Sequence, residues 1–168
     1  KEETFELDVG AIVVSTGFDH ISPDSLKEYG FGLHPDIVTN LQFERLMIQG
    51  IHKPSDGKIP KRVAFILCVG SRMLNGQNGE EHCCKIGCMA AIKQATLLQK
   101  AVAGAQPWVF YIDVRADGKG YEEFYVNAQE HGVRFVRGRV AEVTPAGGGI
   151  LVRAEDTFLG TPIEGTFD

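Results

Sequence analysis

The sequence predicts an α/β fold in which a parallel sheet is covered by helices. Apolar runs at residues 62–67 and 108–114 have the length and composition of buried parallel strands. Each is followed by a segment with helical spacing of its apolar positions, at 88–102 and 121–131. With a further short strand at 133–136, this alternation describes a Rossmann-like, three-layer domain of the nucleotide-binding type.

The end of the chain predicts a small antiparallel β tail. Short strand patterns at 140–143 and 150–154 flank a Pro- and Gly-rich turn at 145–149, and the last residues up to Asp168 suggest a polar return strand.

The start of the chain carries two further strand patterns. Residues 4–8 alternate and predict a half-exposed strand, whereas residues 9–17 are apolar and β-branched and predict a buried one. The second run ends in Ser15, Thr16 and Gly17, whose small side chains would let a ligand approach closely. A plain strand-to-loop turn is the alternative.

Between these strands and the parallel sheet, residues 18–36 have the composition of a loop. A capping-box sequence predicts a helix over 40–49, and 53–60 is a polar connector. We therefore expect two parts, residues 1–60 as a first segment with its linker and 61–168 as the main domain.

Composition limits the functions open to this chain. At 168 residues and 43% hydrophobic it can bury a core, and its formal net charge of −5 argues against a nucleic-acid partner. Its apolar stretches are too short for membrane insertion, and closely grouped cysteines suggest the cytoplasm. The chain begins at Lys1 rather than at methionine, so we expect an internal piece of a longer protein.

All four cysteines gather at one place in this predicted fold. Cys68 ends the strand at 62–67, and Cys83, Cys84 and Cys88 precede or open the next helix. That mouth, outside the carboxyl end of a parallel strand, is where α/β sheets bind ligands. The glycine pattern that cradles a pyrophosphate is missing there, so we expect no useful binding of NAD(P)H.

Several chemistries could use these sulfurs. Four thiolates suit an iron–sulfur cluster or a structural zinc, although zinc sites usually show two short Cys-x2-Cys knuckles, which are missing here. Alternatively, Cys83 and Cys88 could form a redox-active dithiol for thiol–disulfide exchange. Arg72 and Lys85 could favour anionic thiolates. The remaining alternatives are cysteines that are buried and chemically inert, or a non-catalytic domain that binds zinc or a partner.

Longer strings carry a family resemblance. The chain resembles the A subunit of heterodisulfide reductase and its relatives, including flavoprotein subunits of the quinone-interacting membrane-bound oxidoreductase. The strings span nearly the whole chain: Val9-Gly-Ala-Ile-Val-Val-Ser-Thr-Gly-Phe-Asp19, Val38-Thr-Asn-Leu-Gln-Phe-Glu-Arg-Leu46, Lys61-Arg-Val-Ala-Phe-Ile-Leu-Cys-Val-Gly-Ser-Arg72, Cys88-Met-Ala-Ala-Ile-Lys-Gln-Ala95 and Gly118-Lys-Gly-Tyr-Glu-Glu-Phe-Tyr125.

The resemblance implies an oxidoreductase with a thioredoxin-reductase-like fold, FAD, [4Fe-4S] clusters and partner subunits that pass electrons onward. It implies that Ser15, Thr16 and Gly17 touch FAD in the full-length protein, and that residues 1–60 end a flavin-domain segment. It also implies that Cys68 joins Cys83, Cys84 and Cys88 around one cluster. We expect the isolated chain to be inactive and to hold FAD weakly.

The cysteine group departs from the family's pattern at one place. The family's later group usually reads Cys-x3-Cys-Cys, whereas here the adjacent pair comes first, as Cys83-Cys84, and Gly87 stands where a cysteine is expected. The count of four thiols is kept while their arrangement changes.

Overall fold

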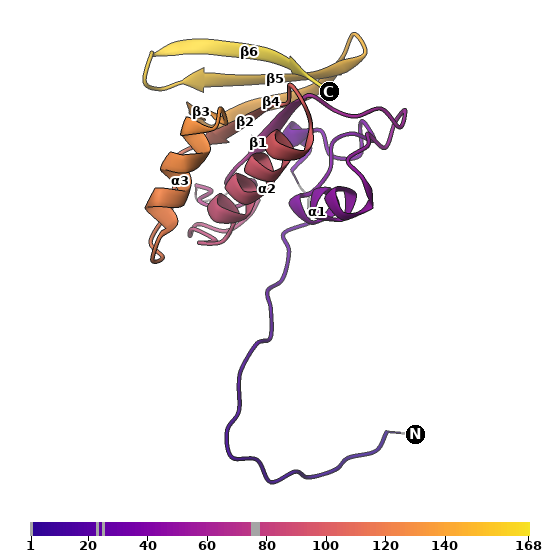
Figure 1. Cartoon of the computed structure of the whole chain (residues 1–168), viewed down its shortest axis with the longest axis vertical. Coiled ribbons are helices and arrows are strands. Elements are labelled where there is room, and N and C mark those ends of the chain that lie inside the picture. Colours follow the sequence, from indigo (N-terminus) through magenta and orange to yellow (C-terminus); the bar gives the residue numbers. More distant parts are fainter. Residues whose placement is uncertain (1, 23, 25, 75–77) are drawn as a thin grey trace.

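The computed structural model forms three layers around a parallel sheet. The structure describes residues 2–22, 24, 26–74 and 78–168. Strands β1 (Arg62–Ile66), β2 (Gln106–Tyr111) and β3 (Arg134–Arg137) lie in the order β1-β2-β3, all parallel. Helices α2 (Gly87–Ala101) and α3 (Tyr121–Glu130) connect them and cover one face (Figure 1).

Successive side chains of each strand point to opposite faces of this sheet, so each face has its own hydrophobic core. On the helical face, Phe65, Leu67 and Val109 pack with α2 residues such as Ile92, which is 0% exposed. On the other face, the neighbouring residues of the same strands, Ile66 among them, pack against a second sheet. Both faces of the parallel sheet are therefore buried, as its continuous apolar runs require.

The second sheet is antiparallel. It consists of β4 (Val140–Ala146), β5 (Gly149–Asp156) and β6 (Thr161–Phe167), in the order β4-β5-β6. Figure 1 shows it on the side of the parallel sheet opposite the helices.

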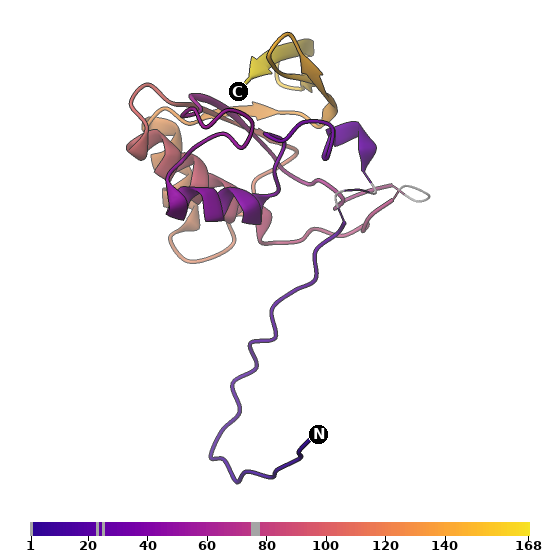
Figure 2. The same ribbon diagram turned by 90° about the vertical axis from the view of Figure 1, so that its right-hand side faces the viewer.

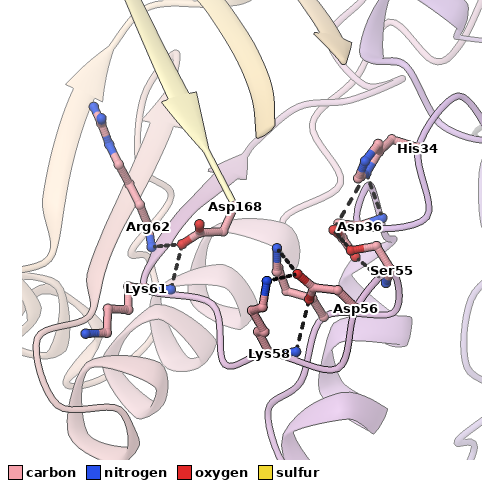
Figure 3. Close-up of polar contacts among 9 residues, drawn as sticks. His34, Asp36, Ser55, Asp56, Lys58, Lys61, Arg62 and Asp168 are labelled. Atoms are coloured by element: carbon pink, nitrogen blue, oxygen red, sulfur yellow. Dashed lines mark hydrogen bonds and ion pairs between the residues drawn. The ribbon is translucent and has the colours of Figure 1, made fainter. Parts of the chain in front are cut away.

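Hydrogen bonds and a close backbone crossing join the two sheets. The carboxylate of Asp168 accepts hydrogen bonds from the backbone N–H groups of Lys61 and Arg62, both at 2.8 Å, which caps the start of β1 (Figure 3). At Gly138, between β3 and β4, a Cβ would lie 1.7 Å from the carbonyl oxygen of Glu155, so only glycine allows this crossing of backbones.

Helix α1 (Asn40–Gln49) packs on the helical face beside α2. Its capping box is present: Thr39 accepts from the N–H of Gln42, and the Gln42 side chain accepts from the N–H of Thr39. The side chain of Gln94 on α2, which is 0% exposed, accepts from the Asn40 amide and donates to Glu44. A buried polar contact therefore fixes α1 on the sheet.

The predicted α/β class, the parallel sheet and the antiparallel tail are confirmed, with shifted boundaries. Strand β2 lies two residues earlier at its start than predicted, because Gln106 and Pro107 already pair with β1. The predicted turn at 145–149 is shorter: Pro145 pairs with Ile150 inside the hairpin, and only Gly147 and Gly148 form the turn. The closer likeness to Rossmann and thioredoxin-reductase folds stays a prediction.

The two strands predicted at 4–8 and 9–17 are wrong for this structure. The segment is extended but unpaired and leads away from the folded body in both views (Figures 1 and 2). Val13 is 87% exposed and Ile12 is 81% exposed. An apolar, β-branched sequence favours a strand only where a neighbouring strand accepts its hydrogen bonds, and no described strand lies beside it.

In the loop between this segment and α1, the 3-10 turn η2 (Lys27–Tyr29) packs on β4. Leu26 and Tyr29 are buried in the core between the two sheets. Across the part of the chain that is described, no helix has the length and apolar character needed to span a membrane.

Candidate redox site

The four cysteines lie where the first parallel strand ends and the next helix begins. Cys68 follows β1, Cys83 and Cys84 lie in the loop, and Cys88 is the second residue of α2. All four are free thiols: Cys88 is buried, Cys68 and Cys83 are half-buried, and Cys84 is exposed. The predicted placement of these residues on strand end, loop and helix start is therefore as the sequence indicated.

The thiols lie close enough to influence one another. Burial raises the pKa of Cys68, the Arg72 guanidinium opposes that rise, and Cys83 and Cys84 add to it. Burial also raises the pKa of Cys88, and Cys68, Cys83 and Cys84 all contribute to the same rise. The loop thus brings all four sulfurs into one electrostatic neighbourhood.

Backbone groups contact three of the sulfurs. The N–H of Lys85 donates to Cys83 Sγ at 3.4 Å, and the N–H of Gly87 donates to Cys84 Sγ at 3.4 Å. The Cys88 thiol donates to the carbonyl oxygen of Asp113 at 3.8 Å. Amide donors aimed at sulfur favour the thiolate form, which is the form that binds metals.

Backbone strain is concentrated in this loop. Among the described non-glycine residues, positive φ occurs at Cys68 (59°), Arg72 (57°) and Lys85 (57°). The left-handed conformation costs a residue with a Cβ roughly 1–2 kcal/mol. Such strain persists only where surrounding contacts over-determine it, and it is typical of functional sites.

An ion pair closes the loop against the end of β2. Arg72 Nη1 lies 2.7 Å from Asp113 Oδ1, and Arg115 lies 3.2 Å from the same oxygen. Sequence reasoning identified Arg72 but missed Asp113. The position of Asp113 two residues beyond β2, at the same sheet edge as Cys68, is the signal that would have found it.

Four thiols are a donor set chemically suited to an iron–sulfur cluster or to zinc, but the described residues do not form a closed metal site. Within the described residues, no three His, Cys, Asp or Glu side chains already surround a point where one metal ion could bind. The Ser71 hydroxyl is buried, and its oxygen has no hydrogen-bond partner among the described residues. A sulfur atom beside the loop would give that hydroxyl an acceptor.

Gly70 and Gly79 of the loop pack against the chain itself. A Cβ on Gly70 would lie 2.9 Å from Ile21 and Leu26 side-chain atoms, and a Cβ on Gly79 would lie 2.5 Å from the Gly70 carbonyl oxygen. These positions therefore hold the loop together and are not an open cradle for a phosphate.

The predicted flavin-contacting residues lie apart from the cysteines along the chain. Ser15, Thr16 and Gly17 are exposed in the extended N-terminal segment, and Gly17 has a φ of 76°. No described atom lies within 4 Å of the position that a Cβ on Gly17 would take. Among the described residues, none forms the opposite side of a binding site at Gly17.

Figure 3 shows a serine, an aspartate and a histidine in contact, but in an order that does not suit catalysis. Asp36 lies between the other two, accepting from Ser55 Oγ at 2.5 Å and lying 3.7 Å from His34 Nδ1. Because the histidine does not face the serine, it cannot remove its proton. The contact instead ties the loop before α1 to the turn at 53–58, beside a cavity of ≈ 330 Å³ that includes His34.

Comparison with known proteins gives similarity over the whole chain. It is 42% identical to an iron-sulfur A subunit of CoB–CoM heterodisulfide reductase, the second of that name in Methanopyrus kandleri, over all of this chain and 27% of that protein. It is 43% identical to the A subunit of the H(2):CoB-CoM heterodisulfide,ferredoxin reductase of Methanothermobacter marburgensis, over all of this chain and 26% of that protein. No family model matches the chain.

The resemblance to the family of heterodisulfide reductase A subunits is thereby confirmed. A Methanosarcina acetivorans relative, the A subunit of the ferredoxin/F(420)H(2)-dependent CoB-CoM heterodisulfide reductase, is 43% identical over 94% of this chain and 21% of its own length. The chain therefore spans about a quarter of the length of the curated heterodisulfide reductase subunits it matches.

Proposed function

We propose that this chain is an electron-transfer module of a cytoplasmic, heterodisulfide-reductase-like oxidoreductase, in which Cys68, Cys83, Cys84 and Cys88 hold a [4Fe-4S] cluster. The observation that carries the proposal is that all four thiols lie at one strand end, in the loop that follows and at one helix start, near enough for Cys68, Cys83 and Cys84 to affect the pKa of Cys88. The word "iron-sulfur" in the name of the Methanopyrus relative supports the same chemistry. When bound, the cluster supplies one-electron transfer.

The chain's own residues would hold and shield this group. Cys68 and Cys88 are the ligands fixed by regular structure, since one follows β1 and the other opens α2. The N–H groups of Lys85 and Gly87 would donate to ligand sulfurs, and Arg72 would balance their negative charge. The buried side of Cys88 would limit access of water.

The N-terminal segment belongs, in this proposal, to a flavin-binding part of the longer protein. Its apolar side chains, such as Val13 and Val14, are exposed, and they form a nearly continuous apolar run in residues 9–17. Burying them against a neighbouring strand would stabilise the segment and place Ser15, Thr16 and Gly17 at FAD. Partner subunits would then exchange electrons with the two cofactors.

Anaerobic reconstitution tests the cluster. The chain is incubated with iron, sulfide and thiol, desalted, and assayed for iron, acid-labile sulfide and absorption near 400 nm. We expect about four irons and four sulfides in the wild type. Cys68→Ser and Cys88→Ser should lose most of both, because each removes a ligand held by regular structure.

Met89→Leu is the matched control, since it removes a sulfur beside Cys88 that cannot act as a thiolate ligand. It should reconstitute like the wild type. One zinc and no iron in the wild type would favour the structural-zinc alternative. No metal, with a Cys83–Cys88 disulfide forming in oxidised glutathione, would favour thiol–disulfide exchange.

A further inference from the structure

The loop from Cys68 to the start of α2, here called the cysteine loop, forms backbone hydrogen bonds within itself. The backbone N–H of Arg72 donates to His82, that of Met73 donates to Glu80, and that of Glu80 donates to Gly70, at 2.9–3.1 Å. Residues 70–73, which follow Cys68, are therefore joined to residues 80–82, which precede Cys83. This pairing sets how far the first cysteine lies from the other three.

One side chain from outside the loop holds it from the face of the second sheet. Arg139, directly before β4, donates from Nη2 to the carbonyl oxygen of Arg72 at 2.9 Å. Its Nη1 lies 3.2 Å from the sulfur of Met73, a residue buried between the two sheets. The two contacts reach consecutive residues of the strained segment.

Tyr29 lies beside Arg139, from a third part of the chain. Burial raises the pKa of this phenol, and the positive charge and hydrogen bond of Arg139 oppose that rise. Tyr29 lies on η2, which packs on β4. Segments far apart in sequence thus meet at one guanidinium, whose planar fork can serve several acceptors in fixed directions.

We propose that Arg139 is a positioning residue for the thiol site: it fixes the backbone of Arg72 and Met73, and its charge lies where it stabilises anionic sulfur. The proposal rests on the proposed function only for its second half. The first half concerns the metal-free chain. Geometric support for the second half is that the Arg139 guanidinium bonds to the carbonyl oxygen of Arg72, four residues after Cys68, and so lies beside the loop that carries the thiols.

The metal-free chain tests the positioning role by hydrogen exchange. Removing the charged donor from the Arg72 carbonyl should speed exchange of the Met73 and Glu80 amides by about tenfold or more in Arg139→Gln. Arg139→Lys should show much of the same loss, because an ammonium lacks the fork. Arg153→Gln is the control: Arg153 also binds two side chains, Glu142 and Glu164, but on the antiparallel sheet.

The reconstituted chain tests the charge. A nearby cation favours the reduced, more negative state of a redox centre, so Arg139→Gln should lower the midpoint potential measured by redox titration with EPR detection. Arg139→Lys keeps the charge and should stay closer to the wild type, and Arg153→Gln should leave the potential unchanged. A merely structural residue would not separate Lys from Gln in this way.

Outcomes of the two arms are distinct. Unchanged exchange at Met73 and Glu80 in both Arg139 variants overturns the positioning role, as does equal loss in Arg153→Gln. A wild type that takes up no iron refutes the proposed function, while the exchange result still decides the positioning role. If Arg139→Gln fails to fold, Tyr29→Phe, which removes only the hydroxyl beside Arg139, should show a smaller change in the same direction, and no change overturns the proposal.

Discussion

Replacing Gly79 with alanine should release the cysteine loop. A Cβ at this position would lie 2.5 Å from the carbonyl oxygen of Gly70 and 2.8 Å from a side-chain carbon of Met73, and the residue has a φ of 123°. That carbonyl accepts the N–H of Glu80, so relief of the clash breaks the pairing that closes the loop. Backbone strain at such a φ costs roughly 1–3 kcal/mol, and overpacking adds about as much.

The structure sets an upper limit on how far Gly79→Ala can lower the free energy of unfolding. The loop can avoid the clash by opening, which sacrifices the three backbone hydrogen bonds between 70–73 and 80–82. At about 1 kcal/mol each, this limits the loss to roughly 3 kcal/mol, less the entropy regained. We therefore expect a free energy of unfolding lower by about 2–3 kcal/mol, measured in urea under anaerobic, metal-free conditions.

Gly57→Ala is the matched control. Gly57 also has a positive φ, 71°, but no described atom lies within 4 Å of its Cβ position. It should lose only the strain of the left-handed conformation, about 1 kcal/mol. If the two variants agree within about 0.5 kcal/mol, and the Glu80 amide stays protected in Gly79→Ala, the close approach of Gly79 to Gly70 is wrong.

Four other predictions follow from the same structure. Ile92→Ala should destabilise the chain by about 2–5 kcal/mol, whereas Leu97→Ala, on the same helix but 42% exposed, should cost clearly less in the same urea assay. The pKa of Asp56 is lowered to about 2, chiefly by the Lys58 backbone N–H and also by Lys53, so its contribution is present above pH 4 and lost towards pH 2; Asp56→Asn should flatten the fall in stability over that window. Calorimetry should show no NADH dissociation constant tighter than roughly 10 μM, and a tighter one would contradict our interpretation of the β1 turn. FAD added to the chain should be lost on desalting, because Ser15, Thr16 and Gly17 form only one wall of a site, and stoichiometric yellow protein would show otherwise.

Local and tertiary signals agree over most of the folded body, which explains why its elements could be predicted. The capping box at Thr39, the helical spacing after Cys88 and the apolar runs of β1 and β2 each describe a structure whose partners lie within this chain. Pro145 shows the limit of turn chemistry: proline favours a turn, yet this one lies at the edge strand β4, where its missing N–H costs little.

The N-terminal segment shows where sequence reasoning fails for a physical reason. Residues 9–17 have the composition of a buried strand, but a strand is defined by hydrogen bonds to a neighbour, and none of the described strands is a neighbour. The composition of a segment indicates whether it suits a buried strand. It does not show whether this chain also contains the strand that would pair with it.

That the four cysteines lie near one another could be predicted from the sequence, whereas the residues that support their loop could not. The grouping of four thiols after one strand is visible in the sequence, because the carboxyl edge of β1 is a local feature. The residues that hold the loop are not local to it: Asp113 follows β2, Arg139 precedes β4 and Tyr29 lies on η2. Asp113 and Arg139 reach the loop, and Tyr29 lies beside Arg139, only because the fold brings these distant segments together. Grouped cysteines can therefore be found by their spacing, whereas the residues that fix the loop around them can be found only from the fold.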